Sequence, residues 1–258
     1  MRALAHILPC LLLCSVVAAQ ESKHEAPSAD ADELRACLRA GMGVGWRGIE
    51  LPSEQGLQKL DSDYFPALDV GVQGAVALTP AFSLGFEARY QTSLGLQAQE
   101  TPAGGVEKST PLRSNDAQFG IVPGLRFADS PDAVKLGILL GWEVRGLRSV
   151  VELSTPSYTL HGPLVRAELV IPIARVLELR LAPEFTYILS VSEDLRELAA
   201  FRGGGTGVGG ELTLAITATP WLGFELGYRE AHVWAPTYWS QSFTDGGRYV
   251  TLRSVLEY

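Results

Sequence analysis

The sequence predicts an all-β fold, namely a closed antiparallel transmembrane β-barrel with ten strands. Three observations predict it. Apolar and polar residues alternate with period two in ten separate segments. The connections between these segments are alternately short and long. After the N-terminal leader, no segment approaches the roughly 20 consecutive apolar residues that a membrane-spanning helix needs.

The clearest alternation is FSLGFEARYQTSLGL, residues 82–96. Phe82, Phe86, Tyr90, Leu94 and Leu96 fall on one face, and polar or small residues fall on the other. Because successive side chains of a strand point to opposite faces, the segment has one apolar and one polar side. The ten predicted segments cover about 34–48, 65–78, 82–96, 119–127, 134–147, 161–171, 177–191, 207–218, 222–234 and 247–258.

The connections between the segments differ in length at the two ends of the predicted barrel. Short turns are expected at 79–81, 128–133, 172–176 and 219–220, and long polar loops at 49–64, 97–118, 148–160, 192–206 and 235–247. An even strand number with short periplasmic turns and long external loops is typical of transmembrane barrels. The count becomes eight or twelve if the segment that contains Pro163, or the segment 119–127, is miscounted.

Aromatic residues cluster near both ends of the segments. A membrane barrel has two such girdles, one at each interface, whereas a soluble secreted barrel, the alternative interpretation of the alternation, needs none. Phe82, Phe127 and Trp221 mark the turn ends. The predicted girdle residues are Trp46, Phe82, Tyr90, Phe127, Tyr187, Trp221, Trp234 and Tyr249.

The N-terminus has the layout of a secretory signal peptide over residues 1–19, with Arg2, a short apolar run and Ala19 before the cut. A flexible polar segment is predicted over 20–33, and the barrel over 34–258. Cleavage leaves Cys37 as the one mature cysteine, so no internal disulfide is expected. The formal charge of −8 becomes −9 when Arg2 is removed, which argues against a nucleic-acid partner.

The chain ends in mid-strand with Val250, Leu252, Leu256 and Tyr258 on one face and Ser254 as a gap. With the signal peptide and the ten segments, this end resembles the superfamily of small bacterial outer-membrane β-barrel proteins. The resemblance implies a location in the bacterial outer membrane, contact with its lipid, and recognition of these last-strand residues by the barrel assembly machinery. A monomer is expected. The last strand would then close against the first and leave no edge in lipid.

The inward face of the predicted barrel carries both signs of charge. Glu87 and Arg89 share a strand face two positions apart, and Glu143 and Arg145 do the same. We expect a cross-strand ion-pair network that fills a narrow lumen, with glycines making room for the long side chains. Its predicted members are Arg39, Arg47, Asp69, Glu87, Arg89, Arg126, Lys135, Glu143, Arg145, Arg166, Glu168, Glu178, Arg180, Glu184, Glu211, Glu225, Arg229, Arg253 and Glu257.

Three functions fit this architecture. The preferred hypothesis is a non-enzymatic barrel with a structural or surface-interaction role. The first alternative is a narrow porin that passes small solutes through the charged lumen. The second is a rim enzyme, either lipid-modifying or similar to the omptin-type surface proteases, with Asp61 and Asp63 in the first long loop and Glu230 and His232 near the loop end of the ninth segment. The external ligand is not identified by the sequence.

Other motifs point to no cofactor or metal. GGGTGVGG, residues 203–210, lacks the Lys-Ser/Thr of a phosphate loop and opens no helix. His161 and His232 have no metal-ligand spacing. Cys37 lies in the inward phase and is interpreted as a small filler.

Overall fold

The computed structural model describes residues 34–53, 56–101, 108–128, 130, 133–150, 157–192, 204–238 and 241–258. The predicted signal peptide and the polar segment 20–33 lie outside these residues. Among the described residues, no helix is both long and apolar enough to cross a membrane.

The strands are β1 Leu34–Ser53, β2 Gly56–Ser62, β3 Phe65–Ala77, β4 Phe82–Ser93, β5 Leu96–Thr101, β6 Lys108–Arg126, β7 Lys135–Ser149, β8 Tyr158–Ala174, β9 Leu177–Ile188, β10 Ser190–Val191, β11 Gly205–Thr219, β12 Leu222–Ala235 and β13 Phe243–Glu257.

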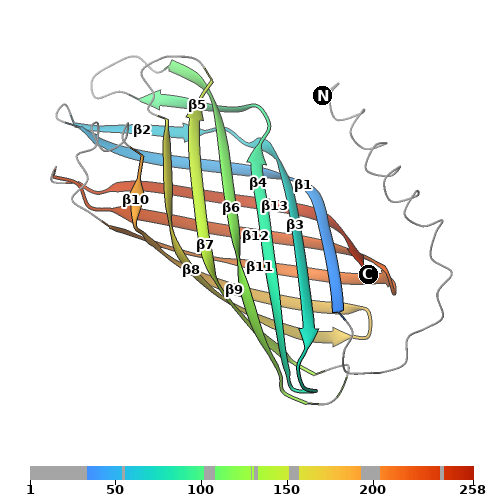
Figure 1. Cartoon of the computed structure of the whole chain (residues 1–258). Coiled ribbons are helices and arrows are strands. Elements are labelled where there is room, and N and C mark those ends of the chain that lie inside the picture. The colour runs from blue at the N-terminus through green and yellow to red at the C-terminus, as the bar shows by residue number, and fades with distance from the viewer. Residues whose placement is uncertain are drawn as a thin grey trace. The chain divides into compact units, whose positions relative to one another are not determined.

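Ten of these strands form a closed antiparallel ring, which confirms the predicted fold class. The order around the ring is β1, β3, β4, β6, β7, β8, β9, β11, β12 and β13, and β13 pairs again with β1. Figure 1 shows the long tilted strands that make up this wall. Because the ring is closed, every spanning strand has two neighbours, and no strand edge is left for lipid to cover.

The three short strands extend the wall at the loop end. β2 leads into β3 across residues 63–64, and β5 follows β4 across residues 94–95. β2 pairs with both β1 and β5, and β5 pairs with β6, so these two strands occupy the places of β3 and β4 above the break (Figure 1). β10 continues β9 along β8 in the same manner.

This extension corrects the expected loops at 49–64 and 97–118. β1 runs on to Ser53, and β6 begins at Lys108 rather than near Phe119. These stretches carry apolar residues such as Ile49 and Leu112 on the inner face and polar ones such as Arg113 on the outer face, so they lack the apolar outer face by which the sequence analysis recognised a strand. Leu96 is also corrected, because it is buried inside the wall. Gly95, at φ +75°, lies at the break before β5, which begins a new alternation.

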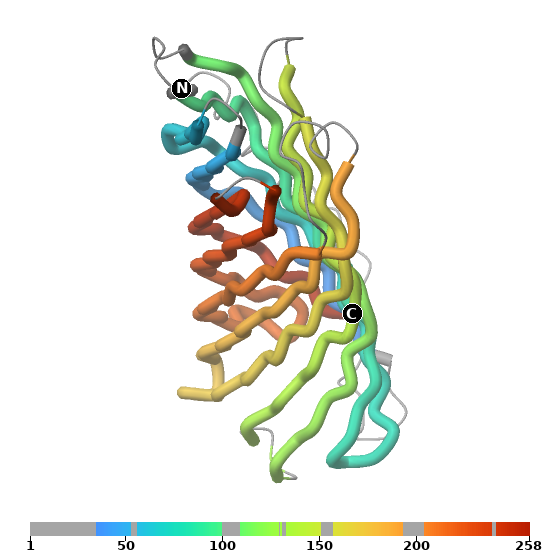
Figure 2. Tube along the Cα trace, turned by 90° about the vertical axis from the view of Figure 1, so that its left-hand side faces the viewer, coloured from blue at the N-terminus to red at the C-terminus, as the bar shows by residue number. Residues whose placement is uncertain are grey.

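The seam between β1 and β13 closes the ring from the pair Cys37–Glu257 to the pair Glu50–Thr244 (Figure 2, blue beside red). Gly41 and Gly43 allow the two backbones to approach here. A Cβ on Gly41 would lie 2.2 Å from the carbonyl oxygen of Leu252, and one on Gly43 would lie 2.2 Å from that of Val250. The inward glycines of β1 therefore determine how closely the first and last strands pack.

The outer face of the ring is apolar, as the alternation predicts. Phe86, Ile121, Val165, Leu226 and Leu252 all point outward and are exposed on the barrel wall. Phe127 and Trp221 lie at the turn ends, and Tyr90, Tyr187 and Trp234 lie toward the loop ends, all of them exposed. Phe82 and Trp46 occupy outward positions of their strands and are half-buried. An outward apolar band between two aromatic girdles is the surface that a bilayer requires.

Tyr249 is the one predicted girdle residue that points the other way. Only 5 % of it is exposed, and its ring packs edge-on against Phe65 with the centroids 6.0 Å apart. Val250 faces outward and is exposed, so Tyr249 has the inward phase of β13. Its polar hydroxyl and apolar ring suit the boundary between the charged interior and the apolar residues above it.

An apolar cluster fills the inside of the barrel at the loop end. We call it the apolar plug. It lies above the charged interior, where the inward residues change from charged to aliphatic. Phe243 and Tyr158 pack edge-on with ring centroids 5.5 Å apart. Burying each large side chain of this kind contributes about 1.5–3 kcal/mol. The plug consists of Ile49, Leu51, Leu60, Phe65, Ala67, Leu96, Ala98, Leu112, Leu147, Tyr158, Leu160, Ile188, Val191, Val233, Ala235, Phe243 and Tyr249.

Candidate functional site

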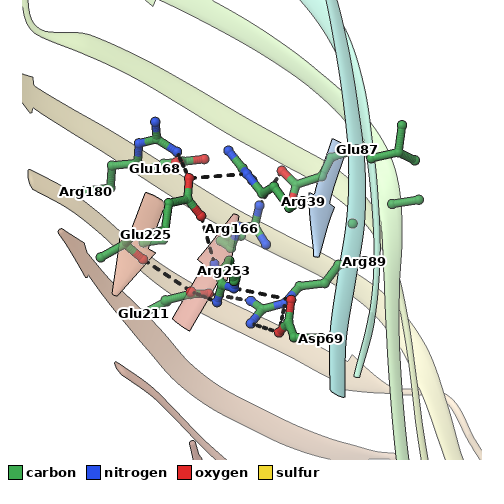
Figure 3. A pocket seen from close by; sticks show the side chains of 15 residues that line it. Arg39, Asp69, Glu87, Arg89, Arg166, Glu168, Arg180, Glu211, Glu225 and Arg253 are labelled. Atoms are coloured by element: carbon green, nitrogen blue, oxygen red, sulfur yellow. Dashed lines mark hydrogen bonds and ion pairs between the residues drawn. The ribbon is translucent and has the colours of Figure 1, made fainter. Parts of the chain in front are cut away.

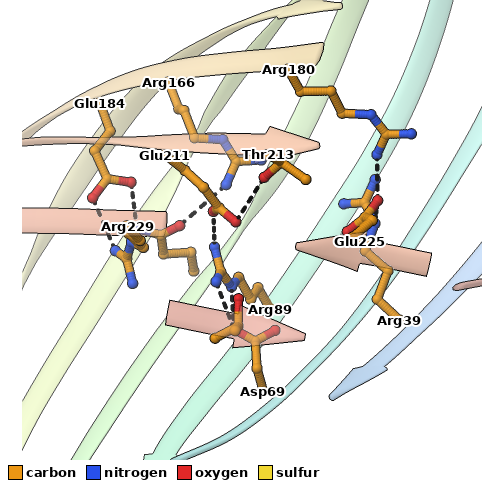
Figure 4. A network of polar contacts seen from close by, with 12 residues as sticks. Arg39, Asp69, Arg89, Arg166, Arg180, Glu184, Glu211, Thr213, Glu225 and Arg229 are labelled. Atoms are coloured by element: carbon orange, nitrogen blue, oxygen red, sulfur yellow. Dashed lines mark hydrogen bonds and ion pairs between the residues drawn. The ribbon is translucent and has the colours of Figure 1, made fainter. Parts of the chain in front are cut away.

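The charged interior lies directly below the apolar plug and is built from inward side chains of all ten ring strands. Figure 4 shows part of it, with arginines and carboxylates alternating across the lumen. The network comprises eight arginines and nine carboxylates, so its charges nearly cancel. Those in ion pairs are Arg39, Arg47, Arg89, Arg145, Arg166, Arg180, Arg229, Arg253, Asp69, Glu87, Asp116, Glu143, Glu178, Glu184, Glu211, Glu225 and Asp245.

The loop-side cluster is centred on Arg47 of β1. Arg47 Nε donates to Asp245 Oδ1 at 2.9 Å, and Nη2 donates to Asp245 Oδ2 at 2.6 Å. Its Nη1 also donates to Ser114 Oγ and lies 3.8 Å from Asp116 Oδ1. Arg145 Nε approaches the same Asp116 oxygen at 3.9 Å. The two arginines therefore share the buried Asp116 directly under the apolar plug, and Arg47 binds Asp245 in the two-point geometry that a guanidinium favours.

The central cluster holds two carboxylates in one place. Arg229 Nη2 lies 3.3 Å from Glu143 Oε1 and 3.0 Å from Glu184 Oε1. The amide Nε2 of Gln118 donates to both of these glutamates, at 3.2 and 3.1 Å. Thr186 Oγ1 donates to Glu143 Oε2 at 2.6 Å. Because these donors converge on Glu143 and Glu184, the two like charges lie together in a buried position at a reduced cost.

The turn-side cluster joins strands from opposite sides of the barrel. Arg89 Nη2 donates to Asp69 Oδ2 at 2.6 Å, and its Nη1 contacts Glu211. Arg253 also contacts Glu211, and its Nε lies 3.3 Å from Asp69 Oδ1. These four residues form a closed square of alternating charge, drawn in Figure 3.

Glu225 connects two further arginines, Arg39 and Arg180, to this square. Its Oε1 receives Arg180 Nη1 at 2.5 Å and lies 3.4 Å from Arg39 Nε, while its Oε2 receives Arg253 Nη1 at 3.2 Å. Glu225 is only 1 % exposed. A buried carboxylate with three cations around it keeps its charge and orders all three side chains.

A cavity of about 30 Å³ lies within the turn-side cluster (Figure 3). It is lined by arginines whose Nε atoms meet no hydrogen-bond acceptor within the described part of the chain, among them Arg166 and Arg180. A cavity needs about 10–15 Å³ of such volume to hold one water molecule, and ordered water in it needs polar partners. The cavity therefore has the size and lining for very few water molecules, which those Nε groups would bind.

Four predicted members of the network stay outside it. Arg126 and Lys135 are cross-strand partners at the turn end, and Glu257 is exposed opposite Cys37. Glu168 lines the cavity. None of the four lies within ion-pair distance of an opposite charge in the described residues. They border the open turn-side end of the barrel, where solvent can satisfy their charges.

Sequence analysis missed Asp116 and Asp245, the partners of Arg47. Both lie in stretches that were expected to be loops. Arg47 and Arg145 had no predicted carboxylate near their level on the neighbouring strands. These two unpaired arginines are the signal that could have located the missing aspartates. Gln118, which joins the two glutamates, was missed for the same reason.

The residues of the rim-enzyme hypothesis lie on the outer wall. His232 Nε2 is 2.9 Å from Glu230 Oε1, and the ring of His232 stacks on Trp234. Glu230 also accepts from Tyr228 Oη at 2.7 Å and from Arg248 Nε at 2.8 Å. These side chains share the outward phase of β12 and β13, so the pair faces the girdle level rather than the mouth of the barrel.

Comparison with known proteins gives matches of structure only. No family model matches the chain, and no curated protein matches it in sequence. The outer membrane protease OmpT from Escherichia coli is similar in structure, with a TM-score of 0.51 and 12 % identity over 91 % of this chain and 99 % of OmpT. The translocator domain of autotransporter NalP from Neisseria meningitidis gives 0.44 and 10 % over 98 % and 96 %, and OprG from Pseudomonas aeruginosa gives 0.41 and 6 % over 88 % and 97 %. The resemblance is one of architecture, and the chain has the fold of the outer-membrane β-barrel proteins.

Proposed function

We propose that this protein is a monomeric bacterial outer-membrane β-barrel with a closed lumen and a structural or surface-interaction role, without enzymatic activity. In this proposal the apolar wall contacts outer-membrane lipid, and the assembly machinery recognises Val250, Leu252, Leu256 and Tyr258. The location is supported by the outward apolar band, the two girdles and the closed ring.

The filled interior is the observation that carries the proposal. A pore needs a continuous polar path, and two features interrupt it. The turn-side cluster leaves a cavity of only about 30 Å³. Above it, Leu60, Leu160 and Phe243 of the apolar plug are completely buried. An ion that entered the plug would lose its hydration without gaining a partner, which costs many kcal/mol.

The wall above the girdle supports the surface role. β1, β2, β5, β6 and β10 extend it there, and their inward residues belong to the plug. Its outer residues are polar and exposed, among them Gln97, Gln99 and Tyr64. A polar projection above a filled lumen is suited to contacts with other molecules outside the cell.

Single-channel recording in planar bilayers tests the proposal. The mature chain, residues 20–258, would be refolded and shown to be inserted by its heat-modifiable gel migration. We expect no discrete openings from the wild type, and none from Arg89→Gln or Arg145→Gln. Reproducible openings whose conductance changes in those two variants would support the narrow porin instead, with the Arg–Glu network as its filter.

A further inference from the structure

Arg113 and Arg148 are direct cross-strand partners on the outer wall, just above the loop-side girdle. They face each other in the register of β6 and β7, and both are exposed. Their strand neighbours Leu112, Ser114 and Leu147 are buried inside the wall, so the two guanidinium groups point outward. Directly opposed residues have Cβ atoms about 4.5–5.5 Å apart, and like charges in this position repel.

The other two loop-side cations described on this outer surface are each neutralised. Arg248 Nε lies 2.8 Å from Glu230 Oε1, and Lys59 Nζ lies 2.8 Å from Glu50 Oε1. In contrast, no described carboxylate lies within 4.0 Å of Arg113 or Arg148. The outer face of β6 and β7 thus carries two adjacent positive charges without a carboxylate partner in the described part of the chain, whereas Arg248 and Lys59 each have one.

Asn115, Gly146 and Thr159 lie side by side on the outer wall directly below this arginine pair, and we call this group the cradle. Gly146 pairs with Asn115 on β6 and Thr159 on β8; it is half-buried, and its carbonyl oxygen accepts from Arg47 Nη1 at 3.3 Å. A Cβ at Gly146 would only reach ordinary van der Waals contact, the nearest atom being Tyr158 O at 3.6 Å, so the missing side chain leaves a shallow space on the outer face. Asn115 Oδ1 accepts hydrogen bonds from Tyr90 Oη and Thr92 Oγ1, both at 2.8 Å. These two bonds orient the amide and leave its Nδ2 group free to donate to a ligand.

The height of the cradle determines what it meets. Tyr90 of the loop-side girdle pairs with Ala117, four residues along β6 from Arg113. Four residues span about 13 Å along a strand, or about 10 Å in height at the tilt of a membrane barrel. Aromatic girdles lie at the headgroup level of a bilayer, and anionic lipid groups lie at and just beyond it.

We infer that Arg113 and Arg148 form a binding site for the phosphate of an outer-leaflet lipid headgroup, with Asn115 and Thr159 donating to the same headgroup over Gly146. Two adjacent guanidinium groups can both bind one phosphate, which removes their mutual repulsion. This site lies outside the barrel and does not depend on whether the lumen conducts.

The test compares two variants with the same loss of charge. Arg113→Gln/Arg148→Gln removes the proposed site, and Lys59→Gln/Arg248→Gln removes the two neutralised cations at the same end. Each refolded protein would be titrated in nanodiscs with bisphosphorylated lipid A and with its dephosphorylated form, and the bound lipid counted by native mass spectrometry. Heat-modifiable migration confirms that each variant has folded.

We expect the wild type to prefer the phosphorylated lipid, and the Arg113→Gln/Arg148→Gln protein to lose about tenfold in affinity for each arginine. The Lys59→Gln/Arg248→Gln protein should retain the preference. An unchanged preference in the first variant, or an equal loss in both, would overturn the assignment. Occupation of the site by inorganic phosphate alone, with equal affinity, would overturn its assignment to a lipid.

Discussion

Arg47 and Asp245 form a two-point ion pair across the closing seam of the barrel, although they are 198 residues apart in the sequence. Arg47 is 2 % exposed and Asp245 is 0 % exposed. Arg47 is opposite Gly247 in the register, so its partner carboxylate lies on the diagonal, two residues along β13. The pair joins the first and last strands at the level where the charged interior meets the apolar plug.

Removal of Asp245 should destabilise the barrel far more than removal of an exposed acid. Asp245→Ala leaves Arg47 buried without its main counter-charge, and we expect a loss of about 3–5 kcal/mol in the free energy of unfolding. Urea unfolding of the refolded protein in lipid vesicles, followed by tryptophan fluorescence, measures this loss. Glu230→Ala is the matched control and should cost less than about 1 kcal/mol. If Asp245→Ala lost no more free energy of unfolding than Glu230→Ala, the seam pair would contribute no more stability than an exposed pair.

The apolar plug should depend on Phe243. Phe243→Ala creates a cavity against Tyr158, and the expected loss is about 3–5 kcal/mol. The outward Phe224→Ala is the control, because lipid can fill the space that its ring leaves. The two variants would be compared in the same unfolding experiment. A loss in Phe224→Ala as large as in Phe243→Ala would contradict the assignment of their faces.

Gly41 should not tolerate a side chain. The Cβ of Gly41→Ala would lie 2.2 Å from a backbone oxygen of β13, whereas that of Gly210→Ala would have no contact closer than 3.4 Å. We expect Gly41→Ala to cost at least about 1–3 kcal/mol and to reduce the folded fraction, and Gly210→Ala to be tolerated. The fraction of heat-modifiable protein after refolding is the readout. Equal folded fractions would show that the seam adjusts without cost.

The bilayer position of the outer face can be tested with one added charge. Leu226 is exposed in the middle of the predicted apolar band, and Leu226→Arg should cost about 2–4 kcal/mol in lipid vesicles. Gln97→Arg, above the girdle on β5, should cost less than about 0.5 kcal/mol. If both variants unfold at the same urea concentration, the apolar band does not lie in lipid.

The spanning part of the fold could be predicted because lipid imposes a strict period of two on it. Phe86 and Leu252 are exposed on the outer face, whereas Arg89 and Arg253 point inward, and the sequence separates them by chemistry alone. The same rule gave ten strands and the positions of the short turns. The rule failed above the girdle. The outer face there is polar, and the apolar residues of each strand point inward into the plug.

The candidate site was predictable in its membership and not in its contacts. The alternation along each strand predicts that Arg89 and Glu211 point inward. Their contact also depends on the diameter of the barrel, which no local pattern encodes. Tyr249 was misplaced because an aromatic residue near a strand end suits either the girdle or the lumen. The cradle around Gly146 gave no signal, since its members are in register only after β6, β7 and β8 pair.

The seam between β1 and β13 has a further consequence for the time course of folding. Its contacts bring together residues 198 positions apart, and closing a loop of that length costs about 5 kcal/mol in chain entropy before any contact is gained. Contacts of such high sequence separation make folding slow. Once the seam is closed, Arg47, Gly41 and the network around Arg253 must all separate together before β13 can leave. The barrel is therefore expected to persist through a slow rate of opening as well as through its equilibrium stability.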